Sequence, residues 1–542
     1  MSSERQAGIY GPGSFTDTSF VPVPEDCKRI LYELASRTPN FTQVKDLLDG
    51  VNFVGHDLPP IPGPIKSAAV TAVLHAMAGI IGHEILALRG VSTDQKTTIN
   101  TDAAGLWLNS IGAVWVDGAE KSAALEAPNL NPEMSKAAVD SALKLRSQAI
   151  YPTATPNVWY QTHGSANPWD ILRSLGVDPD QPNLTGDEAY EAIKTQTLKM
   201  AAGEIELIQL EHGYPGSVVY NPEQWRQTMM GKALAKHPLV NFNQVQFTEN
   251  IKPAAWGPMT PGDTRPLAGI KVLELARVIA APACGAILAS MGAQVIRVNT
   301  IKKVDFTLTL MAGKTTYDLD INDPEGRQRV KELISEADVV IQGYRLRSLE
   351  RRGLGQTMAM EAAARRGRGM IWLDENCYGP DGYYAERPGW QQVADAAAGS
   401  SYVMGKAFGF PEGQGILPCL PISDMSTGAI CAVTIMSMIR DRAKYGGSWY
   451  GCASLTAYDA ATLEPWVGLY QPEVVERIQE EFQFRTWGSD IHVIELYYQI
   501  FDDWKKTPYL MDEGFYTHFS DSVYGKDLKI VAPIVKYSDT KA

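Results

Sequence analysis

The stretch that decides the fold is residues 266–299, which read PLAGIKVLELARVIAAPACGAILASMGAQVIRVN. It begins with a short apolar run typical of a buried strand, continues as an alanine-rich helix and ends in a second strand. The alternation continues, with strands predicted at 270–275, 294–298, 316–319 and 337–341 and helices at 283–291 and from Pro324 to about 335. Strands that alternate with helices indicate a parallel sheet covered on both faces. Residues 266 to about 375 are therefore predicted to form a doubly wound α/β half-domain.

The turn after the first predicted strand argues against a dinucleotide cofactor. Its sequence is RVIAAPAC at 277–284, without the G-x-G-x-x-G pattern that lets a pyrophosphate approach the backbone. NAD is therefore not expected, and we predict no permanently bound cofactor and no metal.

Composition predicts an intracellular globular protein. A net charge of -13 over 542 residues argues against broad binding to nucleic acid or anionic membranes, because these partners need a basic face. The six cysteines are scattered without a C-x-x-C pair, which indicates reduced thiols and neither disulfides nor a zinc site. No secretory signal is expected, and the apolar stretch 67–88 is predicted to be a buried helix because two histidines and a glutamate interrupt it. We expect a cytoplasmic location and leave mitochondrial and peroxisomal alternatives open.

Composition also predicts where the chain divides. The segment 251–265 is rich in Pro and Gly and has no periodic apolar pattern, so it is predicted to be a linker. The predicted regions are an N-terminal extension at 1–61, a helix-rich part at 62–250, this linker, the half-domain with its continuation at 266–460, and a C-terminal tail at 461–542. The tail is aromatic and charged. We expect it to pack against the body of the protein or a second subunit, with a lid as the alternative.

One acidic residue stands where it could do covalent chemistry. Residues 421–430 read PISDMSTGAI, so Asp424 directly precedes an apolar run that continues through Ile439. At the start of a buried helix, unpaired N–H groups and the helix dipole favour the ionised form of a carboxyl group, which is a nucleophile. The alternative is that Asp424 is only an N-cap residue.

A second helix echoes this one. Residues 68–88 and 427–439 are both apolar and contain alanine, and a Pro-Ile pair precedes each of them, at Pro64 and at Pro421. No acid stands at the start of the first copy. If the two are copies, only the second can do carboxylate chemistry.

Four segments resemble, in the same order, the class III CoA-transferases (CaiB/BaiF family), which include formyl-CoA and carnitine-CoA transferases and alpha-methylacyl-CoA racemases. They are residues 266–299, DLDINDPEGRQRVKELISEADVVI at 318–341, YGPDGYYAERPGW at 378–390 and PISDMSTGAICAV at 421–433. Residues 62–248 are more faintly similar to the later half of that family, which would then come first in this chain. The resemblance implies a Rossmann-like doubly wound parallel sheet with a smaller α+β domain, and a homodimer of interlocked, ring-like chains.

The resemblance also implies a reaction. In the family, the acid that matches Asp424 attacks an acyl-CoA thioester to give an aspartyl anhydride, and the CoA thiolate returns to form an aspartyl-CoA thioester. A second carboxylic acid then accepts CoA by the reverse steps. The implied partners are an acyl-CoA and a free carboxylic acid, so coenzyme A thioester is a substrate and not a resident cofactor.

CoA carries several phosphate charges and therefore needs local cations in this acidic protein. Arg277 and Lys314 lie near predicted strand ends, where open α/β sheets bind ligands. The resemblance places CoA contacts at Val278, Ala280, Thr300, Tyr344 and Arg351. The chain departs from the family's usual pattern at Asn299, Thr300 and Gly343.

Trp390 is the position that best separates the reactions within this family. Racemases place a histidine there, which forms a two-base pair with the aspartate. None of the eight histidines lies between His237 and His492, which disfavours both a racemase of the usual kind and a Ser-His-Asp hydrolase. We predict that Trp390 is a wall of the acyl pocket or a core residue. Two alternatives stay open, an alpha-methylacyl-CoA racemase with another second base and a catalytically degenerate CoA-binding relative.

Overall fold

The computed structural model describes residues 5–91, 96–120, 141–164, 167–181, 183–253, 256, 263–299, 308–522 and 525–537. Most of the predicted linker, and Thr300 among the predicted CoA contacts, lie outside the described residues. The division of the chain into five regions stays a prediction.

The largest sheet has seven strands in the order β10, β16, β15, β14, β11, β12, β13. All neighbours run parallel except β10, which is antiparallel to β16. The chain winds outward from β11 to β13, then returns to β14 and winds outward again to β16, so the sheet is doubly wound as predicted. The strand order reverses between β11 and β14, and open sheets bind ligands beside the carboxyl ends of the strands at such a reversal, a place that we call the crevice. The strands are β10 (Asn241–Gln244), β11 (Lys271–Leu275), β12 (Gln294–Asn299), β13 (Lys314–Asp318), β14 (Val339–Gln342), β15 (Ile371–Asn376) and β16 (Trp449–Ser454).

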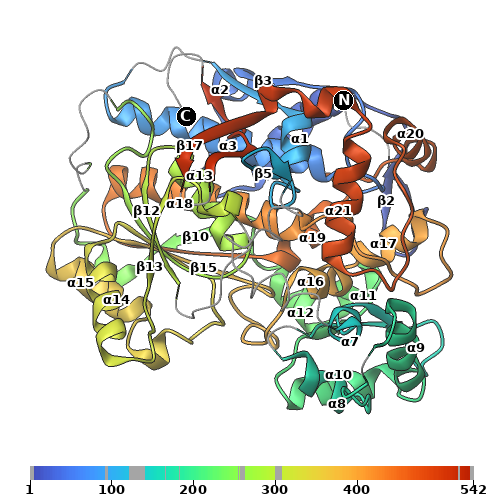
Figure 1. Ribbon diagram of the computed structural model, residues 1–542. Helices are drawn as coiled ribbons and strands as arrows, with labels where there is room; N and C mark the ends of the chain where they lie inside the picture. The colour runs from blue at the N-terminus through green and yellow to red at the C-terminus, as the bar shows by residue number, and fades with distance from the viewer. Residues whose placement is uncertain are drawn as a thin grey trace.

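Different helices cover the two faces of this sheet, and the strand residues alternate between them (Figure 1). In β14, Val339 and Ile341 belong to the core beneath α13 and α18, whereas Val340 belongs to the core beneath α14 and α15. In β15, Ile371 and Leu373 face the same side as Val339. The helices are α13 (Ala280–Ser290) and α18 (Ile422–Tyr445) on one face, and α14 (Pro324–Glu336) and α15 (Gln356–Arg365) on the other.

The two helices that echo each other in sequence pack against each other. The helix α3 (Ser67–Leu88) lies along α18, and the hydroxyl oxygens of Thr71 and Ser426 are 3.0 Å apart. The helix α1 (Val23–Arg37) packs on α3, as α13 packs on α18. By length and composition α3 and α18 could each cross a membrane, but 94% of the apolar window of each is buried inside the protein. The predicted buried helix at 67–88 is confirmed.

A smaller lobe, teal in Figure 1, lies at the lower right of the molecule. Its antiparallel sheet joins β7 (Ile150–Pro152), β8 (Trp159–Thr162) and β9 (Gly216–Val218), and its helices are α7 (Ala142–Arg146), α8 (Pro168–Ser174), α9 (Gly186–Thr197) and α10 (Ala202–Glu211). The Glu206 carboxylate of α10 holds this lobe to the segment that precedes α16 (Gln391–Ala398). It pairs with the Arg387 guanidinium at 2.6 Å and accepts hydrogen bonds from the hydroxyls of Tyr160 and Tyr384.

The C-terminal tail packs against the body of the protein, which was one of the roles predicted for it. The helices α20 (Pro472–Phe482) and α21 (Val493–Trp504) contribute to the main core, and the Trp504 indole donates to the Pro60 carbonyl at 2.7 Å. Strands from the two ends of the chain share sheets. In one sheet, β18 (Gly525–Val531) lies between β17 (Tyr516–Ser522) and β5 (Val114–Val116). In another, β19 (Lys536–Tyr537) pairs with β4 (Thr97–Asn100), which also pairs with β3 (Val51–Val54).

Candidate active site

Asp424 lies in the first turn of α18, at the crevice edge of the large sheet. The helix begins at Ile422, its N-cap residue is Pro421, and no side chain caps it. The N-cap alternative for Asp424 is therefore wrong. Because α18 leads through a short turn into the start of β16, its own start lies at the carboxyl ends of the parallel strands. A hydrogen bond supports this placement, because the Thr427 hydroxyl donates to the carbonyl of Ser454 at the end of β16.

The carboxyl group of Asp424 is half-buried and has no hydrogen bond or ion pair with any residue that the structure describes. Burial raises its pKa to about 7. The sequence analysis expected the helix dipole to favour the ionised form, but the loss of hydration opposes ionisation more strongly. Both protonation states of Asp424 are therefore accessible near neutral pH. A poorly hydrated carboxylate without a partner is a reactive nucleophile.

Three further acids lie around Asp424. The first is Glu375, which was not predicted from the sequence. It lies at the carboxyl end of β15 and is 8% exposed. Within the described ranges its carboxyl group has no hydrogen bond and no ion pair. Burial, and then the negative charge of Asp424, raise its pKa to about 8. The two acids Asp374 and Glu375, which follow the buried run at 371–373, were the signal available in the sequence.

Asp395 of α16 and Asp459 of α19 (Leu455–Thr462) are the other two acids, and both are buried. The Ser423 hydroxyl donates to Asp395 at 3.1 Å, and the Ser400 hydroxyl donates to Asp459 at 3.0 Å. Burial raises the pKa of both carboxyl groups, that of Asp459 to about 8. The first hydrogen bond ties α16 to the residue beside Asp424, and the second ties α17 (Ser400–Ala407) to α19.

The start of α13 meets α18 one turn after Asp424. A Cβ atom on Gly428 would lie 2.6 Å from the Ala280 carbonyl oxygen and 2.7 Å from the Ala283 Cβ atom, so only glycine allows this close approach. This contact places the first turn of α13 beside α18 one turn after Asp424. Just before α13, Val278 has a φ angle of 67°, which strains a β-branched residue. Such strain is concentrated at ligand and active sites.

Four of the predicted CoA contacts lie around the crevice between β11 and β14. Arg277 and Arg351 are exposed, Val278 is half-buried before α13, and Tyr344 is half-buried after β14. Ala280, also predicted, is the buried first residue of α13. Arg277, Arg351 and the neighbouring Arg345 have no carboxylate partner among the described residues. Burial, and then the charge of Arg351, lower the pKa of Arg345, so two cations lie close together here.

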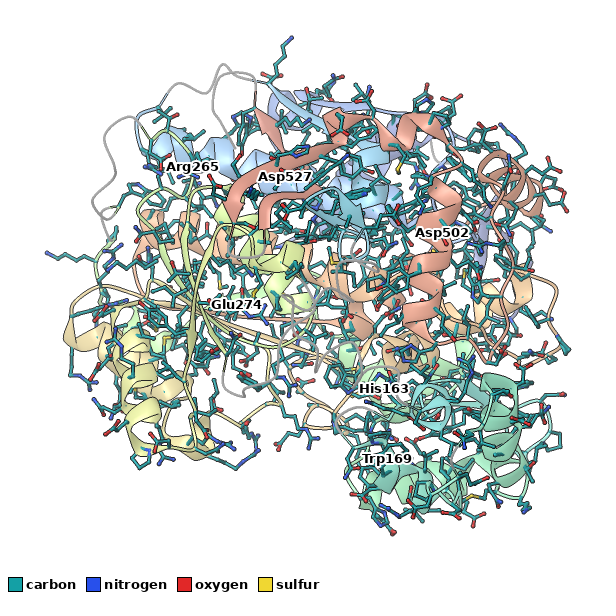
Figure 2. All side chains as sticks on the ribbon, in the orientation of Figure 1. His163, Trp169, Arg265, Glu274, Asp502 and Asp527 are labelled. Atoms are coloured by element: carbon teal, nitrogen blue, oxygen red, sulfur yellow. The ribbon has the colours of Figure 1, made fainter. Side chains whose placement is uncertain are left out.

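Lys314 is not available to CoA, and its predicted role is wrong. Its side chain is fully buried beneath α13, where the ammonium group pairs with Glu274 at 2.7 Å and donates to the Pro282 carbonyl at 2.7 Å. Figure 2 shows Glu274 in the interior of the molecule. Lys314 begins β13, and the amino ends of parallel strands lie at the edge opposite the ligand crevice.

Trp390 precedes α16 and is half-buried, and its indole stacks on the imidazole of His163 with ring centroids 5.4 Å apart. His163 lies where the smaller lobe meets the rest of the chain (Figure 2). Its Nε2 atom is 3.1 Å from the Gln392 side-chain oxygen, and burial lowers its pKa to about 3. No histidine lies between His237 and His492 in the sequence, and yet a distant segment brings the His163 imidazole against Trp390.

The tail also reaches this site. The Tyr497 hydroxyl of α21 is buried, and burial together with the charges of Asp424 and Asp395 raises its pKa. The phenol therefore stays neutral, and α21 forms part of the surroundings of Asp424.

Comparisons with known proteins match residues 267–504 to CoA-transferase family III. An acyl-CoA transferase from Gibberella moniliformis is 54% identical over 99% of this chain and 95% of its own length. An acetyl-coenzyme A transferase from Hypoxylon pulicicidum is 29% identical over 77% of this chain and 72% of its own length. A solved CAIB/BAIF family protein from Brucella suis is 20% identical, covers 52% of this chain and 94% of that chain, and has a TM-score of 0.36.

Proposed function

The chain belongs to CoA-transferase family III and is an enzyme of CoA transfer between an acyl-CoA and a carboxylate, and we propose that it works through Asp424. The ionised Asp424 attacks the thioester carbonyl, which releases CoA thiolate and leaves a mixed anhydride. The thiolate then attacks the aspartyl carbonyl, so the donor acid leaves and CoA stays on Asp424 as a thioester. An acceptor carboxylate repeats these steps in reverse and departs as the new acyl-CoA.

One observation carries this proposal, the Asp424 carboxyl group at the ligand crevice of a doubly wound sheet, which has no partner in the part of the chain that the structure describes. Burying an unpaired acid costs stability, so such a group is expected where its reactivity is used. The first turn of α13 supplies N–H donors for the charge that develops on the attacked carbonyl oxygen.

CoA is proposed to lie across the crevice, with its phosphates near Arg277 and Arg351 and its pantetheine arm along Val278, Ala280 and Tyr344. Arg277 and Arg351 are exposed and have no carboxylate partner among the described residues. They support this orientation of CoA, since phosphates need free cations. Trp390 is proposed to be a wall of the acyl pocket. The homodimer stays a prediction that light scattering tests. The intracellular location stays a prediction that imaging of a tagged protein tests.

Exchange with a CoA-labelled acyl-CoA tests the function. The protein is incubated in deuterated buffer with this donor and with a panel of free carboxylic acids. We expect labelled CoA to appear on an acceptor acid. Deuterium at the carbon next to the thioester, without exchange of CoA, would instead indicate a racemase. Binding of CoA without turnover would indicate a degenerate relative.

A further inference from the structure

Glu375 projects from the sheet toward the helix that carries Asp424. Alternate residues of a strand face the same side, and Ile371 and Leu373 of β15 belong to the core beneath α13 and α18. Glu375 continues this series at the carboxyl end of the strand. The first turn of α18 lies over the same edge, because Thr427 contacts Ser454, whose register partner in β15 is Asn376.

The Glu375 carboxyl group also borders the crevice in which CoA is proposed to bind. A Cβ atom on Gly343, at the end of β14, would lie 3.2 Å from Glu375 Oε2. The same point lies 2.8 Å from the Ala276 Cβ atom and 3.1 Å from the Ala281 Cβ atom, which flank the turn between β11 and α13. Gly343 therefore packs closely against the Glu375 carboxyl group and against the turn between β11 and α13, with no room for a Cβ atom. This close packing places the Glu375 carboxyl group directly beside the ends of β11 and β14.

The titratable neighbours of Glu375 come from three directions. Asp424 and Cys431 face it from α18, Cys452 faces it from β16, and Cys377 follows it in the chain. Burial raises the pKa of all three thiols well above the usual range, so they stay neutral. Asp424 is thus the neighbour whose charge changes during the reaction.

We propose that Glu375 is the acid that protonates the CoA thiolate as it leaves, and the base that takes the proton back before the thiol attacks again. This inference rests on the proposed function of Asp424. In the first step the carbon–sulfur bond of the thioester breaks, the anhydride bond forms, and the proton of Glu375 moves to the sulfur. In the second step the Glu375 carboxylate removes that proton as the sulfur attacks the aspartyl carbonyl. The proton returns to its starting point, and no net acid or base is consumed.

The charge on Asp424 controls when Glu375 releases its proton. While Asp424 is ionised, its charge holds the proton on Glu375. Acylation removes that charge when the thiolate appears, so Glu375 becomes a stronger acid at that moment. Proton transfer is most effective between groups of similar pKa, and a thiol and Glu375 are close in this respect. Protonation also keeps a neutral thiol in the buried crevice between the two attacks.

The test compares Glu375→Gln with Asp374→Asn, which removes the neighbouring carboxyl group on the opposite face of β15. For the unaltered enzyme, kcat/KM should fall above about pH 8, where Glu375 loses its proton. Glu375→Gln should lower kcat about 10²-fold and abolish this decline, because glutamine cannot exchange a proton. Asp374→Asn should keep the decline. Trapping with hydroxylamine should still modify Asp424 in both variants.

Three results would overturn the inference. They are a Glu375→Gln enzyme with unchanged kcat, the same decline above pH 8 in that variant, and no decline in the unaltered enzyme. The last result decides the question even if Glu375→Gln does not fold. If hydroxylamine does not modify Asp424 in the unaltered enzyme, the proposed function itself fails. That outcome is distinct from a failure of Glu375 alone.

Discussion

The first turns of α3 and α18 begin with related sequences and contain opposite arrangements of charge. In α18 the sequence PISD at 421–424 ends in Asp424, which has no partner among the described residues. In α3 the sequence PIKS at 64–67 places Lys66 one residue earlier, where its buried ammonium group pairs with Asp17 and Asp26. Each helix packs on the other and on a further helix, α1 or α13.

The difference shows how one structural position can serve stability or reactivity. The charges around Lys66 satisfy one another in a network, because Asp17 also pairs with Arg5 and Asp26 also pairs with Arg29. Asp424 is left unsatisfied, and burial holds its pKa near neutrality. Paired buried charges are typical of structure, whereas an unpaired buried acid in a crevice is typical of a reactive site. Four predictions test this contrast.

Replacing Asp424 with alanine should have the largest effect. We expect turnover to fall by at least about 10⁴-fold because the nucleophile is lost, while folding and CoA binding persist. The matched control is Ser67→Ala at the corresponding position of α3, which should keep normal activity. Steady-state kinetics and isothermal titration with CoA measure both effects. Ordinary turnover by the Asp424 variant would contradict the contrast.

Replacing Lys66 with methionine should lower the free energy of unfolding by about 3 kcal/mol, because two buried carboxylates each lose a charged hydrogen bond and keep only their arginine partners. The protein that remains folded should still transfer CoA. Ser423→Ala is the control at the corresponding position of α18, and it loses one hydrogen bond worth about 1 kcal/mol. Urea unfolding gives both values. Equal losses in the two variants would show that the two helix starts do not differ in this way.

Replacing Gly428 with alanine should cost about 1–3 kcal/mol of stability, because the added methyl group meets the backbone of α13. It should also lower kcat, since the start of α13 is displaced from Asp424. Thr71 is the corresponding residue of α3, and Thr71→Ala should keep kcat. Thermal unfolding and kinetics on the two variants separate the outcomes. A Gly428 variant with unchanged stability and kcat would contradict the importance of this crossing.

The smallest effect is expected from pH. Only ionised Asp424 attacks the thioester, so kcat/KM should rise about tenfold per pH unit below a midpoint near 7. The stability of the protein over the same range serves as the control. An acid limb centred near pH 4, which is about the usual value for aspartate, would show that burial does not control this carboxyl group.

The sequence predicted the features that depend on neighbouring residues. Apolar runs and helix starts placed the strands of the doubly wound sheet within a few residues, and the segment around 421–424 predicted the start of a buried helix with Asp424 in it, where α18 begins. These signals are local because a strand or the first turn of a helix is formed by consecutive residues.

Features that depend on distant segments were not predictable in this way. Glu375, Asp395 and Asp459 come from two helices and a strand, and only the packed core brings them to Asp424. Lys314 was misassigned for the same reason, since its partner Glu274 comes from another strand. The raised pKa of Asp424 also follows from burial by the assembled core, and no short sequence pattern records that.

The most direct test of the central claim follows oxygen atoms into Asp424. The enzyme is given an acyl-CoA and an acceptor acid that carries ¹⁸O in both carboxyl oxygens, and the peptide that contains residue 424 is analysed by mass spectrometry. The acceptor carboxylate supplies the bridging oxygen of the second anhydride, and the thiolate then attacks the acceptor carbonyl. We therefore predict that Asp424 retains one ¹⁸O atom after a single turnover. Transfer of CoA with no ¹⁸O at Asp424 would contradict the covalent role of this residue.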